Sequence, residues 1–410
     1  MAGPASAAPS EQPTPSAGYD AVLLAGFGGP EGPDDVLPFL RNVTRGRGVP
    51  EERLAEVAEH YLALGGVSPI NAQNRALREA LEADLRRRGL DVPVLWGNRN
   101  WAPYLADTVT DAHAQGLRSL LGVATSAYSS YSSCRQYRED FGRALLETGL
   151  LGVMRIDKLR PYYDLAGFLG PFADGVAAAV HAAAGRGIAV SDIEVVFTTH
   201  SIPLSMAEAS GASGEGRLYV EQHLAGCTAV GAMVRAGLGV APDWQLAYQS
   251  RSGPPEIPWL EPDVNDVIAD LAARGKRGVM VVPIGFVSDH VEVIWDLDTE
   301  AARTAADNGL WFHRVPTPGT HPDFVAGLAE LILERLGIGP GSSDAAPDRT
   351  HRIGSTTALP ARPDLCPPGC CVPRTRRPTT AGADSVTDWA DTDVDPAALA
   401  ASGIGGMVRS

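Results

Sequence analysis

The feature that most constrains the fold is a regular alternation of short apolar runs with longer segments of helical periodicity. A continuous apolar run over 21–25 ends in the turn Gly26-Phe27-Gly28-Gly29-Pro30. Further apolar runs lie at 92–96, 119–127 and 153–159, each separated from the next by a helical stretch. Strands that alternate with helices of this length are typical of a parallel sheet covered by helices. The sequence therefore predicts an α/β fold.

The same pattern starts again after residue 165. The second set of apolar runs lies at 193–199, 245–249, 278–284 and 310–314. This repetition predicts two similar Rossmann-like halves, 19–164 and 165–338, each a parallel sheet flanked by helices. Ligands of such open sheets bind beyond the carboxyl ends of the strands, so candidate functional residues are sought there.

The two ends of the chain differ from these halves. Residues 1–18 are rich in Ala, Pro and Ser and contain neither Lys nor Arg, which predicts a disordered leader and no signal peptide. Residues 339–410 show no apolar period and predict a flexible tail. No run of 18 apolar residues occurs, so no membrane-spanning segment is expected and the cytoplasm is the default location.

The charge of the chain restricts its partners. Lys and Arg number 34 against 49 for Asp and Glu, which gives a net charge of −15. Binding to nucleic acid or to anionic membranes requires a basic face, and a chain this acidic is a poor candidate for either.

A histidine stands where one buried strand ends. His200 follows the apolar run at 193–199, in Phe197-Thr-Thr-His-Ser-Ile-Pro203. A histidine at the mouth of a parallel strand can act as a base near neutral pH. Taken alone, a hydrogen bond to a neighbouring loop is the commoner explanation for such a residue.

Three carboxylates follow another strand end. Glu292, Asp296 and Glu300 are spaced i, i+4 and i+8 on a helix predicted over 290–308. This spacing places them on one helix face, where they repel each other unless a cation such as a hydrated divalent metal lies between them. A solvated acidic face is the alternative, but the apolar residues around them argue against a free surface helix.

Two glycine-containing loops could contact a ligand. The turn after the first strand lacks the spacing of a dinucleotide site, and Pro30 removes a backbone donor, so close approach to a flat ligand fits as well as a phosphate. Arg45 and Arg47 could hold carboxylates by forked hydrogen bonds. On these residues alone a solvent-facing basic loop is favoured.

The five cysteines do not form a typical disulfide framework. Cys366, Cys370 and Cys371 lie within six residues of each other in the tail, and thiolates this dense suit an Fe–S or Zn site. Such a site needs a fourth ligand from the body. Cys134, in a polar loop after a strand, is favoured over Cys227, which lies among Ala and Val in a helix.

Taken together, these motifs resemble ferrochelatase, the family that inserts ferrous iron into a porphyrin. The resemblance runs from about residue 19 to 336. It rests on five motifs in order: LLAGFGGPEGPDDVLPFLRNVTRGRG, GGVSPIN, FTTHSIP, YQSRSGPPEIPWLEPDV and PIGFVSDHVEVIWDLDTE. It implies a chelatase-type fold of two Rossmann-like halves with a porphyrin cleft between them.

The resemblance also implies roles for individual residues. The metal-site histidine of the family corresponds to His200 and its catalytic glutamate to Glu292. The acidic path for the metal corresponds to Asp296 and Glu300. Where some bacterial members have a tyrosine that ligates the metal, this chain has Phe27, so axial ligation by that residue is lost.

Porphyrin-contacting positions correspond to Ser68 and Tyr137, and the carboxylate-holding arginines lie near Arg45 and Arg47. The cysteine tail resembles the extension of members that carry a [2Fe-2S] cluster. Composition and tail resemble actinobacterial members, for which the implied substrate is coproporphyrin III.

Several alternatives remain open at this point. One is insertion of iron into protoporphyrin IX, and another is a chelatase for cobalt or nickel. A non-catalytic haem or metal carrier with a redox-sensing tail is a third. The expected partners are a porphyrin substrate and haem-pathway enzymes that hand over substrate or product.

Overall fold

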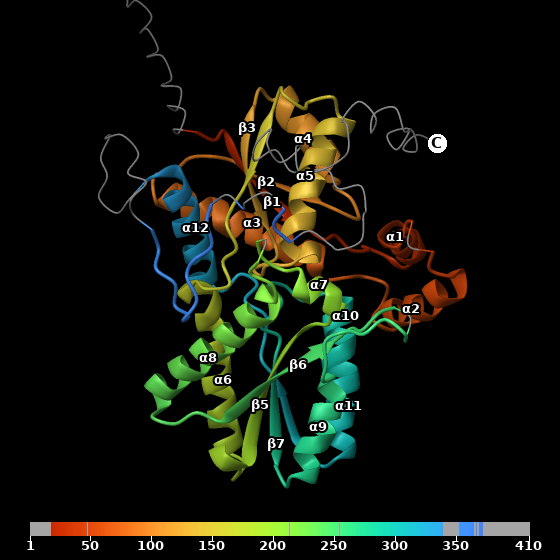
Figure 1. The fold of residues 1–410 in the computed structure, drawn as a ribbon, viewed down its shortest axis with the longest axis vertical. Helices are drawn as coiled ribbons and strands as arrows, with labels where there is room; N and C mark the ends of the chain where they lie inside the picture. Colours follow the sequence, from red (N-terminus) through yellow and green to blue (C-terminus); the bar gives the residue numbers. More distant parts are fainter. Residues whose placement is uncertain are drawn as a thin grey trace, which may run out of the picture.

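The computed structural model describes residues 18–46, 48–212, 214–253, 255–338, 352–364, 366 and 369–371. Two four-stranded parallel sheets, one in each half of the chain, form its centre (Figure 1). The predicted α/β fold with two similar halves is confirmed.

The first half is built around a sheet with the strand order β2-β1-β3-β4. Its elements, in chain order, are β1 (Ala21–Gly26), η1 (Pro33–Asp35), α1 (Val36–Val43), α2 (Glu51–Ala63), α3 (Ile70–Arg87), β2 (Val94–Asn98), α4 (Leu105–Ala114), β3 (Ser119–Ala124), η2 (Tyr131–Arg135), α5 (Gln136–Glu147) and β4 (Arg155–Lys158). All six residues of β1 are buried, which is why this central strand is apolar throughout.

The second half repeats this order as β6-β5-β7-β8. Its elements are α6 (Ala166–Ala184), η3 (Val190–Asp192), β5 (Ile193–His200), α7 (Leu204–Glu208), α8 (Leu218–Leu238), β6 (Asp243–Gln249), α9 (Val264–Ala273), β7 (Gly278–Val282), α10 (Val291–Val293), η4 (Ile294–Ala301), α11 (Ala302–Asp307), β8 (Trp311–Arg314) and α12 (Pro322–Leu336).

Each sheet has one point where the chain order reverses. In the second half this point lies between β5 and β7, which pair in parallel with Val196 opposite Val281. The loops that follow two such strands leave the sheet on opposite sides and open a crevice at their carboxyl ends. His200 ends β5, and Glu292 lies in the segment that follows β7. The topology therefore brings these two residues to one place.

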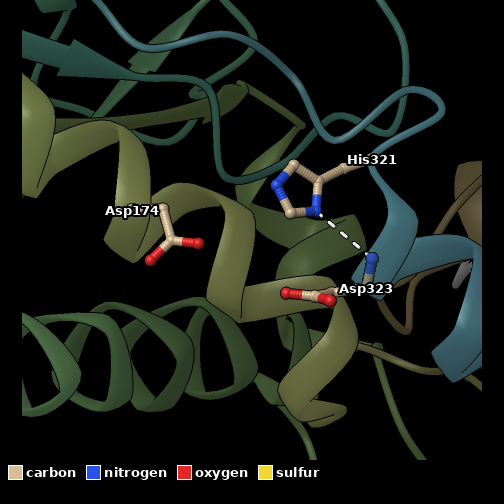
Figure 2. Close-up of side chains that lie close together, drawn as sticks. All are labelled: Asp174, His321 and Asp323. Carbon is tan, nitrogen blue, oxygen red and sulfur yellow. Dashed lines mark hydrogen bonds between the residues drawn. The ribbon is translucent and has the colours of Figure 1, made fainter.

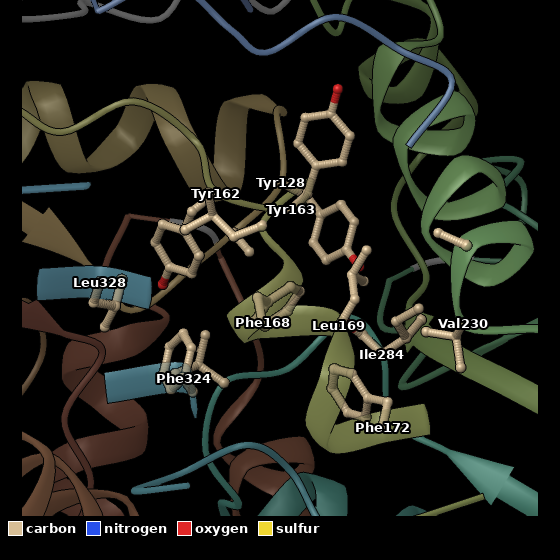
Figure 3. Packing of buried hydrophobic residues seen from close by; sticks show 14 of the residues in the cluster. Tyr128, Tyr162, Tyr163, Phe168, Leu169, Phe172, Val230, Ile284, Phe324 and Leu328 are labelled. Carbon is tan, nitrogen blue, oxygen red and sulfur yellow. The ribbon is translucent and has the colours of Figure 1, made fainter. Parts of the chain in front are cut away.

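One hydrophobic core joins the two halves. Figure 3 shows part of it, where Phe168 of α6 packs against Tyr162 and against Phe324 of α12. The ring centroids of Phe168 lie 5.7 Å from Tyr162 and 5.8 Å from Phe324, and neither phenylalanine is exposed. Helix α12 also packs on α3 of the first half. The two sheets thus share their apolar interior.

The helix predicted over 290–308 is not a regular α-helix, so that prediction was wrong in detail. A short α10 leads into a π-helical segment, η4, before α11 restores the α-helix. A second π-helical turn, η2, precedes α5. Hydropathy did not reveal these widened turns because they change the hydrogen-bond spacing without changing which residues are apolar.

Part of the tail differs from the flexible segment predicted from residue 339. Residues 352–364 lie along the body, where the backbone N–H of Thr356 donates to the carbonyl of Asp164 at 2.9 Å. The Tyr163 hydroxyl donates to the carbonyl of Pro360 at 3.1 Å. Polar contacts fix this segment, and such contacts leave no apolar period in the sequence. No helix in the described part of the chain is long and apolar enough to cross a bilayer.

Candidate active site

His200 and Glu292 face each other, as the topology requires. The Nε2 atom of His200 lies 3.5 Å from Oε1 of Glu292. Their side chains keep 34% and 40% of their surface accessible, so water or a ligand can reach both groups. A base and a carboxylate in contact at an accessible strand mouth can exchange protons with a ligand and hold a cation.

The ring of His200 is oriented by its own backbone. Its Nδ1 atom makes a short hydrogen bond to the carbonyl oxygen of Ser201, and a carbonyl can only accept. Nδ1 therefore carries the hydrogen, and Nε2 faces Glu292. In the neutral imidazole, Nε2 is then the atom with the free lone pair.

Glu292 and His200 stabilise each other's charged forms. Burial alone would lower the pKa of His200, but the charge and hydrogen bond of Glu292 outweigh it and raise this pKa above its ordinary value. Burial would likewise raise the pKa of Glu292, but the charge of His200 outweighs it and brings this pKa to about 2. Each group thus favours the charged form of the other.

Asp296 has the opposite behaviour. Burial and then the charge of Glu292 raise the pKa of Asp296 to about 7, against hydrogen bonds that favour its ionised form. These come from Gln249, whose Nε2 donates at 3.2 Å, and from a short contact with the Ser250 hydroxyl. Asp296 is thus poised to gain or lose a proton near neutrality.

Glu300 completes the predicted acidic ladder. Its Oε1 accepts a hydrogen bond from Nε1 of Trp295 at 2.9 Å, and its charge acts on Asp296. The spacing of the three acids was predicted for an α-helix, in which each step of four residues drifts by about 40°. In the wider turns of η4 the drift is different, but the three acids remain electrostatically coupled.

Sequence reasoning missed three residues around the pair and Asp296. Ser250 hydrogen-bonds Glu292 and has a left-handed φ of 62°. His290 is close enough to feel the charges of His200 and Glu292. Burial lowers the pKa of His290, and the charge of His200 lowers it further, while the charge of Glu292 acts in the opposite direction. Gln249 ends β6. The rule that led to His200, a polar residue at a strand end, would have found Gln249 and Ser250.

Helix α2 of the first half lies against the acidic segment. The ring of His60 stacks on Trp295 with centroids 4.2 Å apart and planes 7° apart. On the next residue, burial and then the charge of Glu292 raise the pKa of Tyr61, so its phenol stays protonated. Phe39 links Tyr61 to the accessible ring of Phe27, at centroid distances of 5.9 and 6.3 Å.

Two of the predicted substrate-contacting residues, Ser68 and Tyr137, are buried in this structure. Ser68 is buried against Gly29, where an added Cβ would lie 2.7 Å from the Cβ of Ser68. Tyr137 is 3% exposed and lies under the guanidinium of Arg99, 4.1 Å from its ring centroid. Burial this deep leaves its ring little surface for a ligand in this conformation.

Of the two predicted arginines, only one can be placed. Arg45 is exposed, and its charge acts on the phenol of Tyr104. Arg47 lies outside the described residues. A role for either in holding carboxylates stays a prediction.

The tail cysteines meet Cys134. A hydrogen bond with Cys366 is the largest cause that raises the pKa of Cys134, followed by burial. Cys366 also contacts Cys370, whose Sγ lies 3.7 Å from that of Cys371. Cys227 lies elsewhere, fully buried in the shared core. The structure thus gathers the four cysteines that the sequence analysis favoured.

Positive groups surround these four thiols. The charges of Lys158 and Arg138 act on Cys134, and the tail residue Arg362 is affected by Cys366 and Cys370. The backbone N–H of Gly211 also points at Sγ of Cys371 at 3.2 Å. Buried cations and N–H donors stabilise thiolates, so the surroundings fit a site that holds negatively charged sulfur.

A second group of potential ligands lies on the surface. Asp174 of α6 approaches His321 and Asp323 at the start of α12, with one ligand atom of each within 4.8 Å of the others (Figure 2). His321 caps this helix, because its Nδ1 accepts the backbone N–H of Asp323 at 3.3 Å. The positive end of the helix dipole disfavours a cation there. We assign this group to capping.

A model of the family described as ferrochelatase matches residues 19–336. The chain belongs to the ferrochelatase family. Membership makes it an enzyme of the lyase class, as its motifs predicted.

Curated relatives support this family. The coproporphyrin III ferrochelatase of Leifsonia xyli subsp. xyli is 54% identical over 380 residues, which cover 90% of this chain and 95% of that protein. The coproporphyrin III ferrochelatase of Streptomyces griseus subsp. griseus is 52% identical over 377 residues and covers 90% and 97%.

Among solved structures, SirB from Bacillus subtilis with Fe3+ matches with a TM-score of 0.43 and 14% identity. The match covers 77% of this chain and 94% of SirB. This likeness concerns the fold alone and carries no argument about the reaction.

Proposed function

We propose that this ferrochelatase inserts ferrous iron into coproporphyrin III, to give the iron coproporphyrin of haem b biosynthesis. The observation that carries the proposal is the contact between His200 and Glu292 at the mouths of two adjacent strands. Relatives about half identical over nearly their whole length are named for this porphyrin.

The reaction requires that two pyrrole N–H protons leave as Fe2+ enters. His200 accepts a proton through Nε2, once its own proton has been lost, because Nδ1 is committed to Ser201. Glu292 stabilises the resulting imidazolium and offers an oxygen to the incoming metal. The two protons end in solvent, and the charge of the metal replaces them on the ring.

Asp296 and Glu300 supply the path for the metal. Both are carboxylates beside Glu292, and carboxylate oxygens suit a partly hydrated divalent ion. Asp296 releases a proton near neutral pH, so it can bind the cation and return to its protonated form after the cation has passed on. This order of events reduces the repulsion among the three carboxylates.

The propionates need cationic or hydrogen-bonding partners. Arg45, Arg47 and Ser68 are proposed for this role, together with the hydroxyl of Tyr137. Four propionates on coproporphyrin III make more demands on such groups than the two on protoporphyrin IX. Binding energy at the propionates can offset distortion of the ring.

The test is an anaerobic assay with Fe2+ and either porphyrin, followed through the porphyrin absorption bands. Faster metallation of coproporphyrin III supports the proposal, and faster metallation of protoporphyrin IX reassigns the substrate. In the same assay His200→Ala and Glu292→Gln should lose turnover while porphyrin still binds. Near-normal kcat in either variant would contradict the assigned roles.

We further propose that Cys134, Cys366, Cys370 and Cys371 hold a [2Fe-2S] cluster. Four sulfur ligands satisfy this cluster, and the nearby cations and the Gly211 N–H suit its negative charge. When bound, the cluster would supply a one-electron redox centre and a covalent tie between tail and body. Because burial and mutual hydrogen bonds raise the pKa of Cys134, Cys366 and Cys370, ligation must release their protons.

The cluster has a direct spectroscopic test. Protein purified without oxygen should be brown, and Cys366→Ser should remove the visible absorption. Cys227→Ser is the matched control, since this thiol is buried away from the site and the colour should persist. Colourless protein that contains one Zn would overturn the cluster.

A further inference from the structure

We propose that Tyr219 is a positioning residue for His200, and that it ties this base to the cysteine site. The inference rests on the proposed roles of His200 and of the four cysteines. Its basis is a continuous set of buried hydrogen bonds that runs from Cys371, through the start of α8, to the end of β5.

The first step links Tyr219 to the base. Its hydroxyl donates to the backbone carbonyl of His200 at 2.9 Å and lies 2.8 Å from Oγ1 of Thr199. Tyr219 and Thr199 are both at most 5% exposed, so these bonds do not exchange with water. Tyr219 thereby fixes the carbonyl of the residue whose Nε2 must face Glu292.

The second step links Tyr219 to the loop before α8. Its backbone N–H donates to the hydroxyl of Ser210 at 2.9 Å, and Ser210 is fully buried. The next residue, Gly211, makes a pair of hydrogen bonds with Cys371. The N–H of Cys371 donates to the Gly211 carbonyl at 2.7 Å, and the N–H of Gly211 points at the sulfur at 3.2 Å.

The segment that carries Cys134 reaches the same helix. The N–H of Ser129 donates to Oε1 of Gln222 at 2.8 Å, and Nε2 of Gln222 donates back to the Ser129 hydroxyl at 3.0 Å. Gln222 lies one turn after Tyr219 on α8 and is fully buried. The first turns of α8 are therefore held by two segments, each of which carries a cysteine of the site.

Backbone conformation supports a built connection. Among the described residues, those other than glycine with a left-handed φ are Arg217, Ser250 and Cys371. Arg217 directly precedes α8, and Cys371 is at the other end of the link. Such conformations persist only where surrounding contacts enforce them. A site that no longer holds Cys371 should let the start of α8 relax, and Tyr219 would then hold His200 less well.

The experiment combines kinetics with amide hydrogen exchange on the full-length protein. Tyr219→Phe should lower kcat about tenfold and leave KM and equilibrium binding of coproporphyrin III within about twofold. Tyr162→Phe is the matched control, because it also removes a buried phenol that donates to a carbonyl, that of Ala124 at 2.8 Å, but lies outside the link. It should stay within about twofold of the unmodified protein in kcat.

The link to the cysteine site is tested by Cys371→Ser. This change should speed exchange in the segment from Ser210 to Gln222, whether or not turnover persists. In the double variant Cys371→Ser, Tyr219→Phe, kcat should be much less than tenfold below that of Cys371→Ser alone. Both changes act through the hydrogen bond from Tyr219 to the His200 carbonyl, so their effects should not multiply. If Cys371→Ser does not fold, Ser210→Ala replaces it, since it removes the bond to the Tyr219 N–H together with the local bond from the Ser210 hydroxyl to the Ala207 carbonyl.

Three results would overturn the inference: Tyr219→Phe indistinguishable from Tyr162→Phe, unchanged exchange in the segment, or fully multiplicative effects on kcat. Failure of the proposed function looks different. In that case the unmodified protein would not metallate the porphyrin, or His200→Ala would turn over normally in the same assay. If the unmodified protein metallates the porphyrin and His200→Ala does not, then a Tyr219→Phe variant with unchanged kcat refutes the positioning role.

Discussion

The contact between His200 and Glu292 gives the site a pH dependence that can be measured on the histidine itself. The raised pKa of His200 means that its stabilising contribution to the fold is present below its ordinary pKa and is lost as pH rises through the folded-state value. The same proton must leave before Nε2 can act as a base.

We therefore expect the acid limb of kcat/KM to lie above the ordinary pKa of histidine. Proton NMR should give the same raised pKa for the His200 ring. Glu292→Gln removes the charge that does most to raise it, so the pKa of His200 in that variant should fall, because burial is then opposed only by the Ser201 hydrogen bond and the charge of Asp296. An unchanged ring pKa in Glu292→Gln would show that Glu292 does not set it.

Asp296 predicts a separate pH effect on the metal. With a pKa of about 7, it is mostly protonated at pH 6 and mostly ionised at pH 8, so KM for Fe2+ should fall as pH rises through neutrality. Asp296→Asn should flatten this dependence. Asp298→Asn is the control, because Asp298 pairs with Arg314 instead, at 2.6 Å. A KM that titrates equally in Asp296→Asn would contradict the proposed path.

Close packing between α6 and α12 limits the size of the side chain that their contact can hold. Gly167 of α6 faces α12 so closely that an added Cβ would lie 2.3 Å from the carbonyl oxygen of Asp323. Gly170, three residues later on α6, has open space instead. The pair offers a matched comparison of the same substitution on one helix.

Gly167→Ala should lower the free energy of unfolding by about 1–3 kcal/mol, because the helices must separate to admit the methyl group. Gly170→Ala should be neutral or raise it by up to about 1 kcal/mol through helix propensity. Urea unfolding followed by circular dichroism measures both. Equal effects of the two changes would show that the contact between α6 and α12 is not tight in solution.

The elements themselves were largely predictable. The observed β5 and β8 match the apolar runs predicted at 193–199 and 310–314 to within a residue, because strands of a parallel sheet leave short continuous apolar runs. The widened turns of η4 were not predictable. Tyr61 was also missed, since its helix is distant from Glu292 in sequence and only the fold brings the two into electrostatic range.

At the scale of the whole molecule, the described part of the tail acts as a strap. Arg160, which is fully buried, pairs with Glu334 of α12 at 3.0 Å. The tail adds to this group, because the Ile353 N–H donates to Glu334 and its carbonyl accepts from Arg160. The sequence did not predict that this segment packs on the body, because the strap is held by ion pairs and backbone contacts, which leave no apolar pattern.

Removal of the strap should therefore destabilise the body. A chain that ends after Ile338 leaves several buried polar groups without partners, at about 1–3 kcal/mol each where water does not reach them. We expect its Tm to fall by several degrees in calorimetry. A chain that ends after Cys371 keeps the strap and should have the same Tm as the full-length protein. Equal melting of both truncated chains would contradict a structural role for the strap.

The apolar interior shared by the two sheets has a consequence for how the protein can be divided. Phe168 and Phe324 belong to one half by sequence, yet they lie in a single core with Leu24 and Leu77 of the other. Either half expressed alone would present that surface to water and aggregate. The molecule has two sheets but a single cooperative unit, so it should unfold in one step. Neither half can be exchanged for that of a relative unless the shared core between the halves is redesigned as well.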